Sequence, residues 1–121
     1  MYYGMSSGSL AKMYVKGSLA NTGDGFTFKV KNLVDSGSIS GLAKVTVDDE
    51  EKSLDGVTIE LNGNVRPVAS LSWSSSLYVN YGAVMTIYVP GALEPGEHTV
   101  KLTVKAPELG QLTLPVTDTI E

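Results

Sequence analysis

The strongest constraint on the fold of this chain is a strict alternation of apolar and polar residues over short stretches. In the stretch HTVKLTVK, the residues His98, Val100, Leu102 and Val104 fall on one side, and threonines and lysines fall on the other. This period of two is typical of a β-strand with one face on a core and the other in water. A helix would repeat apolar residues every three to four positions, and no stretch longer than about ten residues does so.

The same alternation recurs along the chain. It predicts strands over residues 26–31, 42–47, 57–61 and 112–116, a weaker strand over 10–19, and a further one in which Ala69, Leu71 and Trp73 share a face. Glycine, proline, asparagine and aspartate separate these stretches. About eight short strands of this kind predict an all-β, antiparallel two-sheet β-sandwich of jelly-roll or immunoglobulin-like type, formed by residues 10–121 as one domain. The pattern does not give the strand order.

The turn residues predict how consecutive strands are connected. Residues 83–89 form an apolar run that predicts a strand covered on both faces, and Pro90, Gly91, Pro95 and Gly96 after it predict a hairpin into the strand that starts at His98. Asn62-Gly63 predicts a second hairpin, and the segment NTGDG at residues 21–25 predicts a turn.

Two prolines predict where strands lie within their sheets. Neither Pro67 nor Pro115 can donate a ladder hydrogen bond, so both are expected on edge strands or at a bulge.

Charge and composition exclude several classes of partner. The net charge is -4, and the basic residues are scattered singly, which argues against a nucleic-acid or anionic-membrane surface. No apolar run approaches the ~20 residues that span a bilayer, and no basic flank followed by an apolar segment opens the chain, so we expect no signal peptide. There is no cysteine, which fits a reducing compartment and makes the cytoplasm the expected location.

Few residue types in this chain could carry out catalysis. His98 is the only histidine, and its place at the start of a strand favours a structural hydrogen-bonding role. The run DDEE at residues 48–51 lacks the alternate-position pattern of a calcium loop and predicts a solvated turn. A carboxylate pair drawn from Glu60, Glu94, Glu97 and Asp118 could converge in space, but nothing in the spacing of these residues indicates that it does. We therefore predict no catalytic residue and no metal ligand in this chain.

Aromatic residues outside the predicted core are candidates for a partner interface. Residues 1–9 combine glycine and serine with Tyr2 and Tyr3, which predicts a flexible arm. Chain ends are usually disordered, so this arm is either a frayed terminus or, as the functional alternative, a segment that orders against a partner. Trp73, Tyr78 and Tyr81 lie near a serine-rich segment and could form a binding surface, although aromatic residues in sheets are more often core.

The order of features from Gly17 to Asp118 resembles the small β subunit of bacterial C-glycoside deglycosidases. Four segments carry the resemblance: GSLANTGDGFTFKVKN, GLAKVTVDDEEKSLDGVTIELNG, LEPGEHTVKLTV and LGQLTLPVTDTI. It implies a non-catalytic subunit of a carbon-carbon lyase that cleaves the C-glycosidic bond of 3-keto C-glycosides. The partner it implies is a TIM-barrel α subunit that holds a divalent metal, manganese, and the catalytic residues. This chain would brace the active site of that partner.

Two other hypotheses come from different classes. In the first, the chain is a freestanding carbohydrate-binding β-sandwich, and Trp73 and Tyr81 stack on sugar rings. In the second, it is an immunoglobulin-like module of a larger surface protein, with neither a ligand nor a partner subunit.

Overall fold

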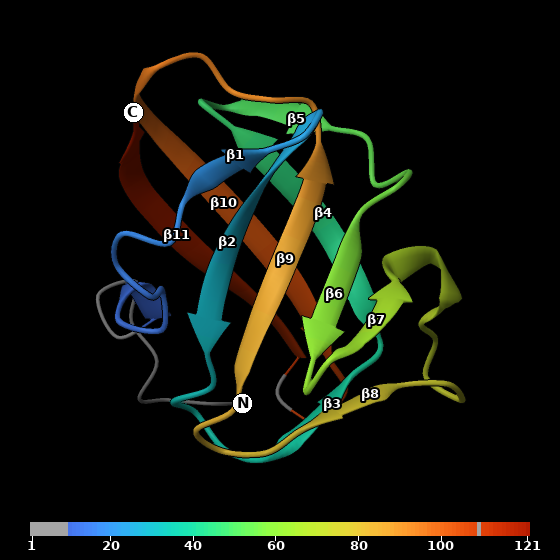
Figure 1. The fold of residues 1–121 in the computed structure, drawn as a ribbon. Helices are drawn as coiled ribbons and strands as arrows, with labels where there is room; N and C mark the ends of the chain where they lie inside the picture. Colours follow the sequence, from blue (N-terminus) through green and yellow to red (C-terminus); the bar gives the residue numbers. More distant parts are fainter. Residues whose placement is uncertain (1–9, 109) are drawn as a thin grey trace.

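The computed structural model describes residues 10–108 and 110–121, and in that part of the chain it is an antiparallel β-sandwich (Figure 1). One sheet has the order β1 (Ala20–Thr22), β2 (Gly25–Lys31), β9 (Val84–Pro90), β6 (Thr58–Leu61), β7 (Asn64–Pro67). The facing sheet has the order β11 (Gly110–Ile120), β10 (Gly96–Ala106), β4 (Gly41–Val47), β5 (Glu50–Lys52). A two-stranded ribbon of β3 (Gly37–Ile39) and β8 (Leu77–Val79) lies across one end, and η1 (Val68–Ser70) is a short 3-10 turn.

The alternating side chains of both sheets meet in a single core. From the first sheet, Phe26 and Phe28 are fully buried, with ring centroids 6.3 Å apart. From the facing sheet, Val100 and Leu102 are equally buried. Burial of these inward residues is the main force that holds the two sheets together. The predicted alternation over 26–31, 42–47 and 98–105 is confirmed.

The strand order is that of an immunoglobulin-type sandwich. When β1, β2, β4, β6, β9, β10 and β11 are named A to G in chain order, the sheets read A-B-E-D and G-F-C, with β7 extending the first sheet beyond D and β5 extending the second beyond C. The strands β3 and β8 then belong to the connections between B and C and between D and E. Of the two predicted sandwich types, the strand order therefore matches the immunoglobulin-like one.

Two predicted turns are tight two-residue hairpin turns. Asp48 and Asp49 connect β4 to β5, and Asn62 and Gly63 connect β6 to β7; all four have positive φ angles. Positive φ at both central residues is the geometry that best matches the twist of paired strands. The prediction of a hairpin at Asn62-Gly63 is confirmed, and the predicted turn at residues 48–51 is confirmed for Asp48 and Asp49, whereas Glu50 and Glu51 belong to β5.

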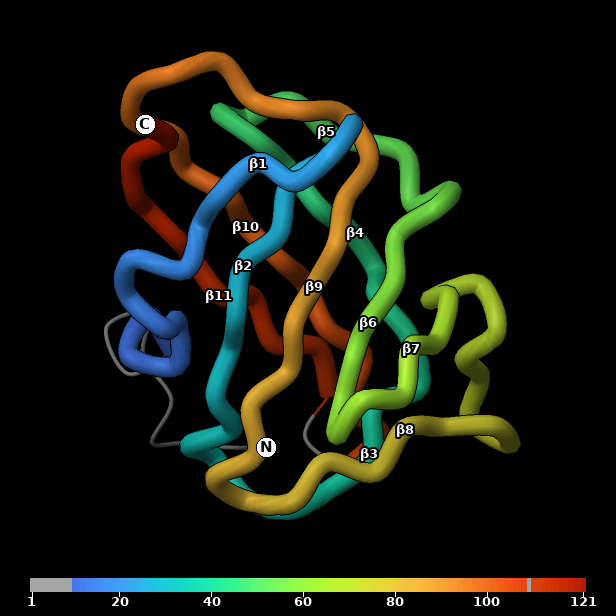
Figure 2. The backbone as a smooth tube through the Cα atoms, viewed as in Figure 1, coloured from blue at the N-terminus to red at the C-terminus, as the bar shows by residue number. Residues whose placement is uncertain are grey.

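The predicted hairpin between residues 83–89 and the strand at His98 is wrong. β9 pairs with β2 and β6, whereas β10 pairs with β4 and β11 in the other sheet. Figure 2 shows the connection between them passing from one layer to the other at the end opposite the ribbon. Hydrogen bonds to the β1–β2 hairpin fix the position of this connection. Gly91 N–H donates to the Asp24 carbonyl at 2.8 Å, and Leu93 N–H donates to the Asn21 side-chain oxygen at 2.8 Å.

Three further strand predictions need correction. β9 buries only one face, because Val84 is exposed while Met85, Ile87 and Val89 are buried. Residues 10–19 form no named strand and make only an isolated bridge from Tyr14 to Val30. The predicted strand containing Ala69, Leu71 and Trp73 is replaced by η1 and a loop. The backbone carbonyls of this segment accept hydrogen bonds from the Arg66 side chain, where in a sheet they would accept them from a neighbouring strand.

The proline predictions are confirmed. Pro67 lies on β7 and Pro115 on β11, and each of these strands is the edge of its sheet. The predicted arm of residues 1–9 lies outside the described residues. In the described part of the chain, no helix has the length and apolar character needed to cross a membrane.

Candidate functional site

Trp73 lies at the apex of a tight turn in the connection between η1 and β8. Ser72 and Ser75 exchange backbone hydrogen bonds of 3.1 Å in both directions, and the Ser72 hydroxyl accepts a further bond from Ser75 N–H at 3.1 Å. The Trp73 side chain is not packed against the domain, because 84% of its surface is exposed. A hydrogen-bonded turn therefore presents a large aromatic ring to the outside.

Arg66 on β7 holds this turn against the sandwich. Its guanidinium group donates to the carbonyl oxygens of Ser70, Ser75 and Ser76 at 3.2, 3.3 and 3.4 Å, and to the Ser75 hydroxyl at 3.1 Å. A planar group with five donors can reach several carbonyls at once, which an ammonium group cannot do from one position. Arg66 is a functional candidate that sequence analysis missed, because one arginine before a serine-rich segment carries no motif.

Two further predicted interface residues, Tyr78 and Tyr81, lie on the same connection, further along the chain. Tyr78 is on β8 and is 58% exposed, and Tyr81 follows β8 and is 61% exposed. Tyr81 N–H donates to the Ser36 hydroxyl at 2.8 Å, which fixes the turn after β8 to the segment before β3. Tyr78 and Tyr81 therefore lie at the end of the sandwich that carries the β3–β8 ribbon, and the turn of Trp73 adjoins this end beside the edge strand β7. We call this end, together with the Trp73 turn, the ribbon end. Tyr2 and Tyr3 lie outside the described residues.

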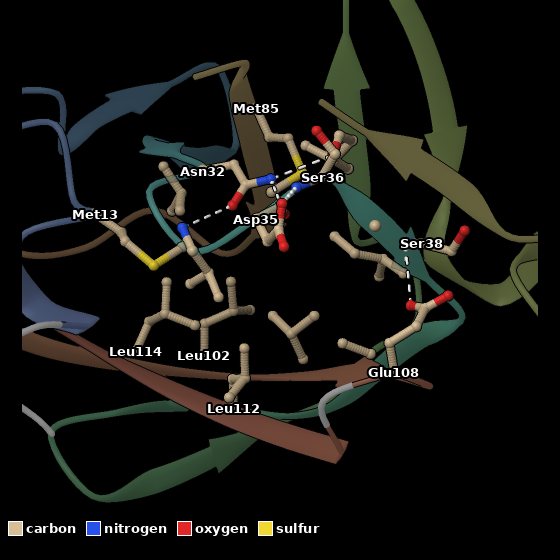
Figure 3. A pocket seen from close by; sticks show the side chains of 17 residues that line it. Met13, Asn32, Asp35, Ser36, Ser38, Met85, Leu102, Glu108, Leu112 and Leu114 are labelled. Carbon is tan, nitrogen blue, oxygen red and sulfur yellow. Dashed lines mark hydrogen bonds between the residues drawn. The ribbon is translucent and has the colours of Figure 1, made fainter. Parts of the chain in front are cut away.

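A cavity of about 220 Å³ opens at the ribbon end, between the two sheets (Figure 3). Apolar side chains from both sheets line its interior, among them Val30, Met85, Leu102 and Leu114. Exposed polar residues line its mouth: Asp35 and Ser36 come from the segment before β3, and Glu108 comes from the turn between β10 and β11. The cavity was not predicted, since it depends on how far the two sheets separate.

Asn32 fixes the wall of this cavity. It is the one buried polar side chain among the described residues, and its amide group donates to the carbonyl oxygens of Asp35, Val79 and Asn80 at 2.8, 3.2 and 3.3 Å. Its side-chain oxygen accepts Val34 N–H at 3.1 Å. Because a buried amide is stable only when its donors and acceptor are all used, this network ties the segment after β2 firmly to β8.

His98 is used as a structural residue. Its Nδ1 lies 2.7 Å from a carboxylate oxygen of Asp48, and its Nε2 lies 2.7 Å from the carbonyl oxygen of Glu94. A carbonyl and an ionised carboxylate can only accept, so this geometry favours the doubly protonated, positively charged ring, in which both nitrogens donate. The hydrogen bond to Asp48, followed by the one to Glu94, raises the pKa of His98. The prediction of a structural hydrogen-bonding role is confirmed.

Asp48 and Asp118 each accept several hydrogen bonds. Thr99 N–H donates to Asp48 at 2.9 Å, and this bond, followed by the one from His98, lowers the pKa of Asp48. The Tyr14 hydroxyl donates to Asp118 at 2.7 Å and is the largest cause of the lowered pKa of that carboxyl. Asp118 is one of the four carboxylates considered as a catalytic pair. In the structure it binds Tyr14 and Gly17 and so fastens the segment before β1 to β11. Within residues 10–108 and 110–121, no three acidic or histidine side chains come together as a metal site.

Comparison with known proteins decides the family. The family model for the hydroxymethylglutaryl-CoA reductase N-terminal domain matches residues 9–121, which is nearly the whole chain. The chain belongs to this family. No match is found among curated proteins.

Membership of the hydroxymethylglutaryl-CoA reductase N-terminal domain family corrects the resemblance to C-glycoside deglycosidase β subunits, which is wrong. The segments that carried it, such as LEPGEHTVKLTV, are turn-and-strand patterns that many β-sandwiches share. The lyase reaction, the C-glycoside substrate, the TIM-barrel partner and its manganese ion rest on that resemblance alone and lose their basis with it.

Proposed function

We propose that this chain is a non-catalytic docking domain whose ribbon end binds the catalytic region of a hydroxymethylglutaryl-CoA reductase. The observation that carries the proposal is the 84% exposed Trp73 ring on a turn that Arg66 holds in place. Tryptophan is enriched among the residues that dominate binding energy at interfaces, and a turn whose backbone is already hydrogen-bonded loses little backbone entropy on docking. The description of the family supplies the partner, since it names one part of a larger reductase.

The position of the exposed aromatic residues supports the same proposal. In antibody variable domains, the B–C and F–G loops of one end of the sandwich form the binding surface. Here the corresponding connections, together with the D–E connection, form the ribbon end. This likeness to antibody domains is an analogy of fold, and it agrees with the exposure of Tyr78 and Tyr81 at that end.

The remaining features of the proposal follow from composition. The chain has no cysteine, which suits a reducing compartment, and we place the domain in the cytoplasm. Its scattered basic residues give it no surface for nucleic acid, so we propose a protein partner.

Titration calorimetry of the chain with the catalytic region of the reductase from the same organism tests this function. Trp73→Ala should weaken binding by at least ~30-fold, the effect expected of a central aromatic contact. Lys44→Ala serves as a control, because Lys44 is an exposed residue of β4 in the other sheet and should leave the affinity unchanged. Unchanged affinity in the Trp73→Ala variant would show that the ribbon end does not dock.

Carbohydrate binding remains the second candidate, favoured by the same exposed indole ring. It predicts that soluble oligosaccharides titrated into the isolated chain shift the Trp73 fluorescence, and that Trp73→Ala removes their binding. If no oligosaccharide binds at millimolar concentration, the candidate is rejected.

A further inference from the structure

We propose that the cavity at the ribbon end is a binding site for a small aromatic molecule, neutral or cationic, that carries a hydrogen-bond donor. This proposal goes beyond the docking function and is measured on the isolated chain. Its failure would leave docking unaffected, and a failure of docking would leave the cavity site unaffected.

The volume of the cavity sets the size of the ligand. An engineered apolar cavity of ~150 Å³ binds benzene, which has six carbon atoms. The cavity here measures about 220 Å³, so the same packing accommodates about nine non-hydrogen atoms, the size of an indole ring. A coenzyme A thioester is far larger than this and carries several negative charges, so the cavity is not a site for the substrate named in the family description.

The lining of the cavity favours an aromatic ligand. Met13 and Met85 both line it, and their exposed fractions are only 6% and 4%. Methionine side chains adapt to irregular shapes, and the thioether sulfur makes favourable contacts with aromatic ring edges. Leu102 and Leu114, from the facing sheet, supply aliphatic side chains on the opposite side of the cavity (Figure 3).

The mouth of the cavity sets the charge of the ligand. Asp35 and Glu108 are its two acidic residues, and the described residues that line the cavity include no lysine, arginine or histidine. Asp35 accepts Ser36 N–H at 2.8 Å, and Glu108 accepts Ser38 N–H at 3.4 Å (Figure 3). Among the described residues, only one oxygen of each carboxylate accepts a hydrogen bond. The other oxygen is available to a donor on the ligand, while an anionic ligand would be repelled.

A series of three probes with the same ring tests the site. Tryptamine is cationic, indole is neutral and indole-3-acetate is anionic at pH 7. Each is titrated into the isolated ¹⁵N-labelled chain and followed by the amide chemical shifts. We expect saturable shifts at cavity residues such as Val30 and Leu114 for tryptamine and indole, and at least tenfold weaker binding of indole-3-acetate. Shifts confined to other regions, or tighter binding of the anion, would overturn the proposal.

Two variants with matched controls separate the cavity from the rest of the surface. Ala106→Phe fills the cavity and should weaken tryptamine binding at least tenfold. Lys105→Phe adds the same ring to the neighbouring, exposed position of β10 and should have no effect. If Ala106→Phe folds and binds tryptamine as tightly as the unmodified chain, the proposal is wrong.

Glu108→Gln keeps an acceptor for Ser38 and removes one charge, so it tests the site even if Ala106→Phe does not fold. It should reduce the preference for tryptamine over indole-3-acetate at least threefold, whereas Glu97→Gln, an exposed position distant from the lining residues, should not. An unchanged preference in Glu108→Gln would contradict the assigned role of the mouth.

Discussion

His98 shows how one side chain joins two distant parts of the chain. Its ring bridges Asp48, in the β4–β5 turn, and Glu94, in the connection from β9 to β10, and only 13% of the side-chain surface is exposed. Sequence analysis placed His98 on the inward side of a strand and expected a structural role. It could not name the partners, because Asp48 is fifty residues away and reaches His98 only through the pairing of β4 with β10.

The His98–Asp48 pair predicts a pH dependence of stability. The pKa of His98 is raised in the folded chain, so its contribution to the free energy of unfolding is complete below its unfolded value of about 6.5 and is lost as the pH rises through the folded value. The pKa of Asp48 is lowered, so its contribution is present above about pH 4 and is lost as the pH falls through the folded value.

Urea denaturation at pH 5.5 and pH 8.5 measures this dependence. The unmodified chain should be more stable at the lower pH, and His98→Gln should remove most of the difference. An NMR titration that places the pKa of His98 at or below that of an unstructured peptide would contradict the charged ring.

At the scale of elements, local pattern predicted the strands better than it predicted their partners. Alternation and turn residues identified β2, β4, β6, β10 and β11, and the edge positions of Pro67 and Pro115 followed from the missing N–H group. The hairpin prediction at Pro95-Gly96 failed, because these residues permit a change of direction without fixing which sheet receives the next strand. A connection from β9 into the other sheet uses the same residues and buries both strands in the core.

The prediction of a strand at residues 69–73, in the loop that carries Trp73, failed for a related reason. Apolar residues at alternate positions predicted a strand at 69–73, but the described segment has no paired neighbour there and its carbonyls bind Arg66. A side chain from an earlier strand thus replaces the ladder that a sheet would supply. Conversely, the exposure of Trp73 agrees with its prediction as an interface candidate, which the sequence could only weigh against a place in the core.

The Arg66 contacts predict a local effect of mutation. Arg66→Ala should speed amide hydrogen exchange at Ser75 at least tenfold and lower the free energy of unfolding by about 1 kcal/mol, since the bonds that are lost are largely exposed to solvent. Arg66→Lys is the matched control for charge, and it should resemble Arg66→Ala because one ammonium group cannot reach all three carbonyls. Full protection of Ser75 in the lysine variant would show that charge alone orders the turn.

At the scale of the whole molecule, composition and pattern led to the β-sandwich, and the strand order specified the immunoglobulin type. The cavity and the ribbon end could not be predicted, because both arise where segments from residues 32–39, 77–85 and 102–114 meet in space. The family also lay beyond the sequence patterns, since β-sandwiches of different families share the same turns and alternation. The match over residues 9–121 supplied it.

The most direct test of the central claim uses Trp73 itself, which is the only tryptophan of the chain. Trp73 is replaced by 5-hydroxytryptophan, whose fluorescence can be excited separately from that of tryptophans in the partner. This fluorescence is then followed while the catalytic region of the reductase is added. The proposed docking predicts a shift of the emission to shorter wavelength and at least a threefold loss of quenching by acrylamide, because a ring that is now 84% exposed becomes buried. Complex formation with the emission and the quenching of Trp73 unchanged would contradict the account.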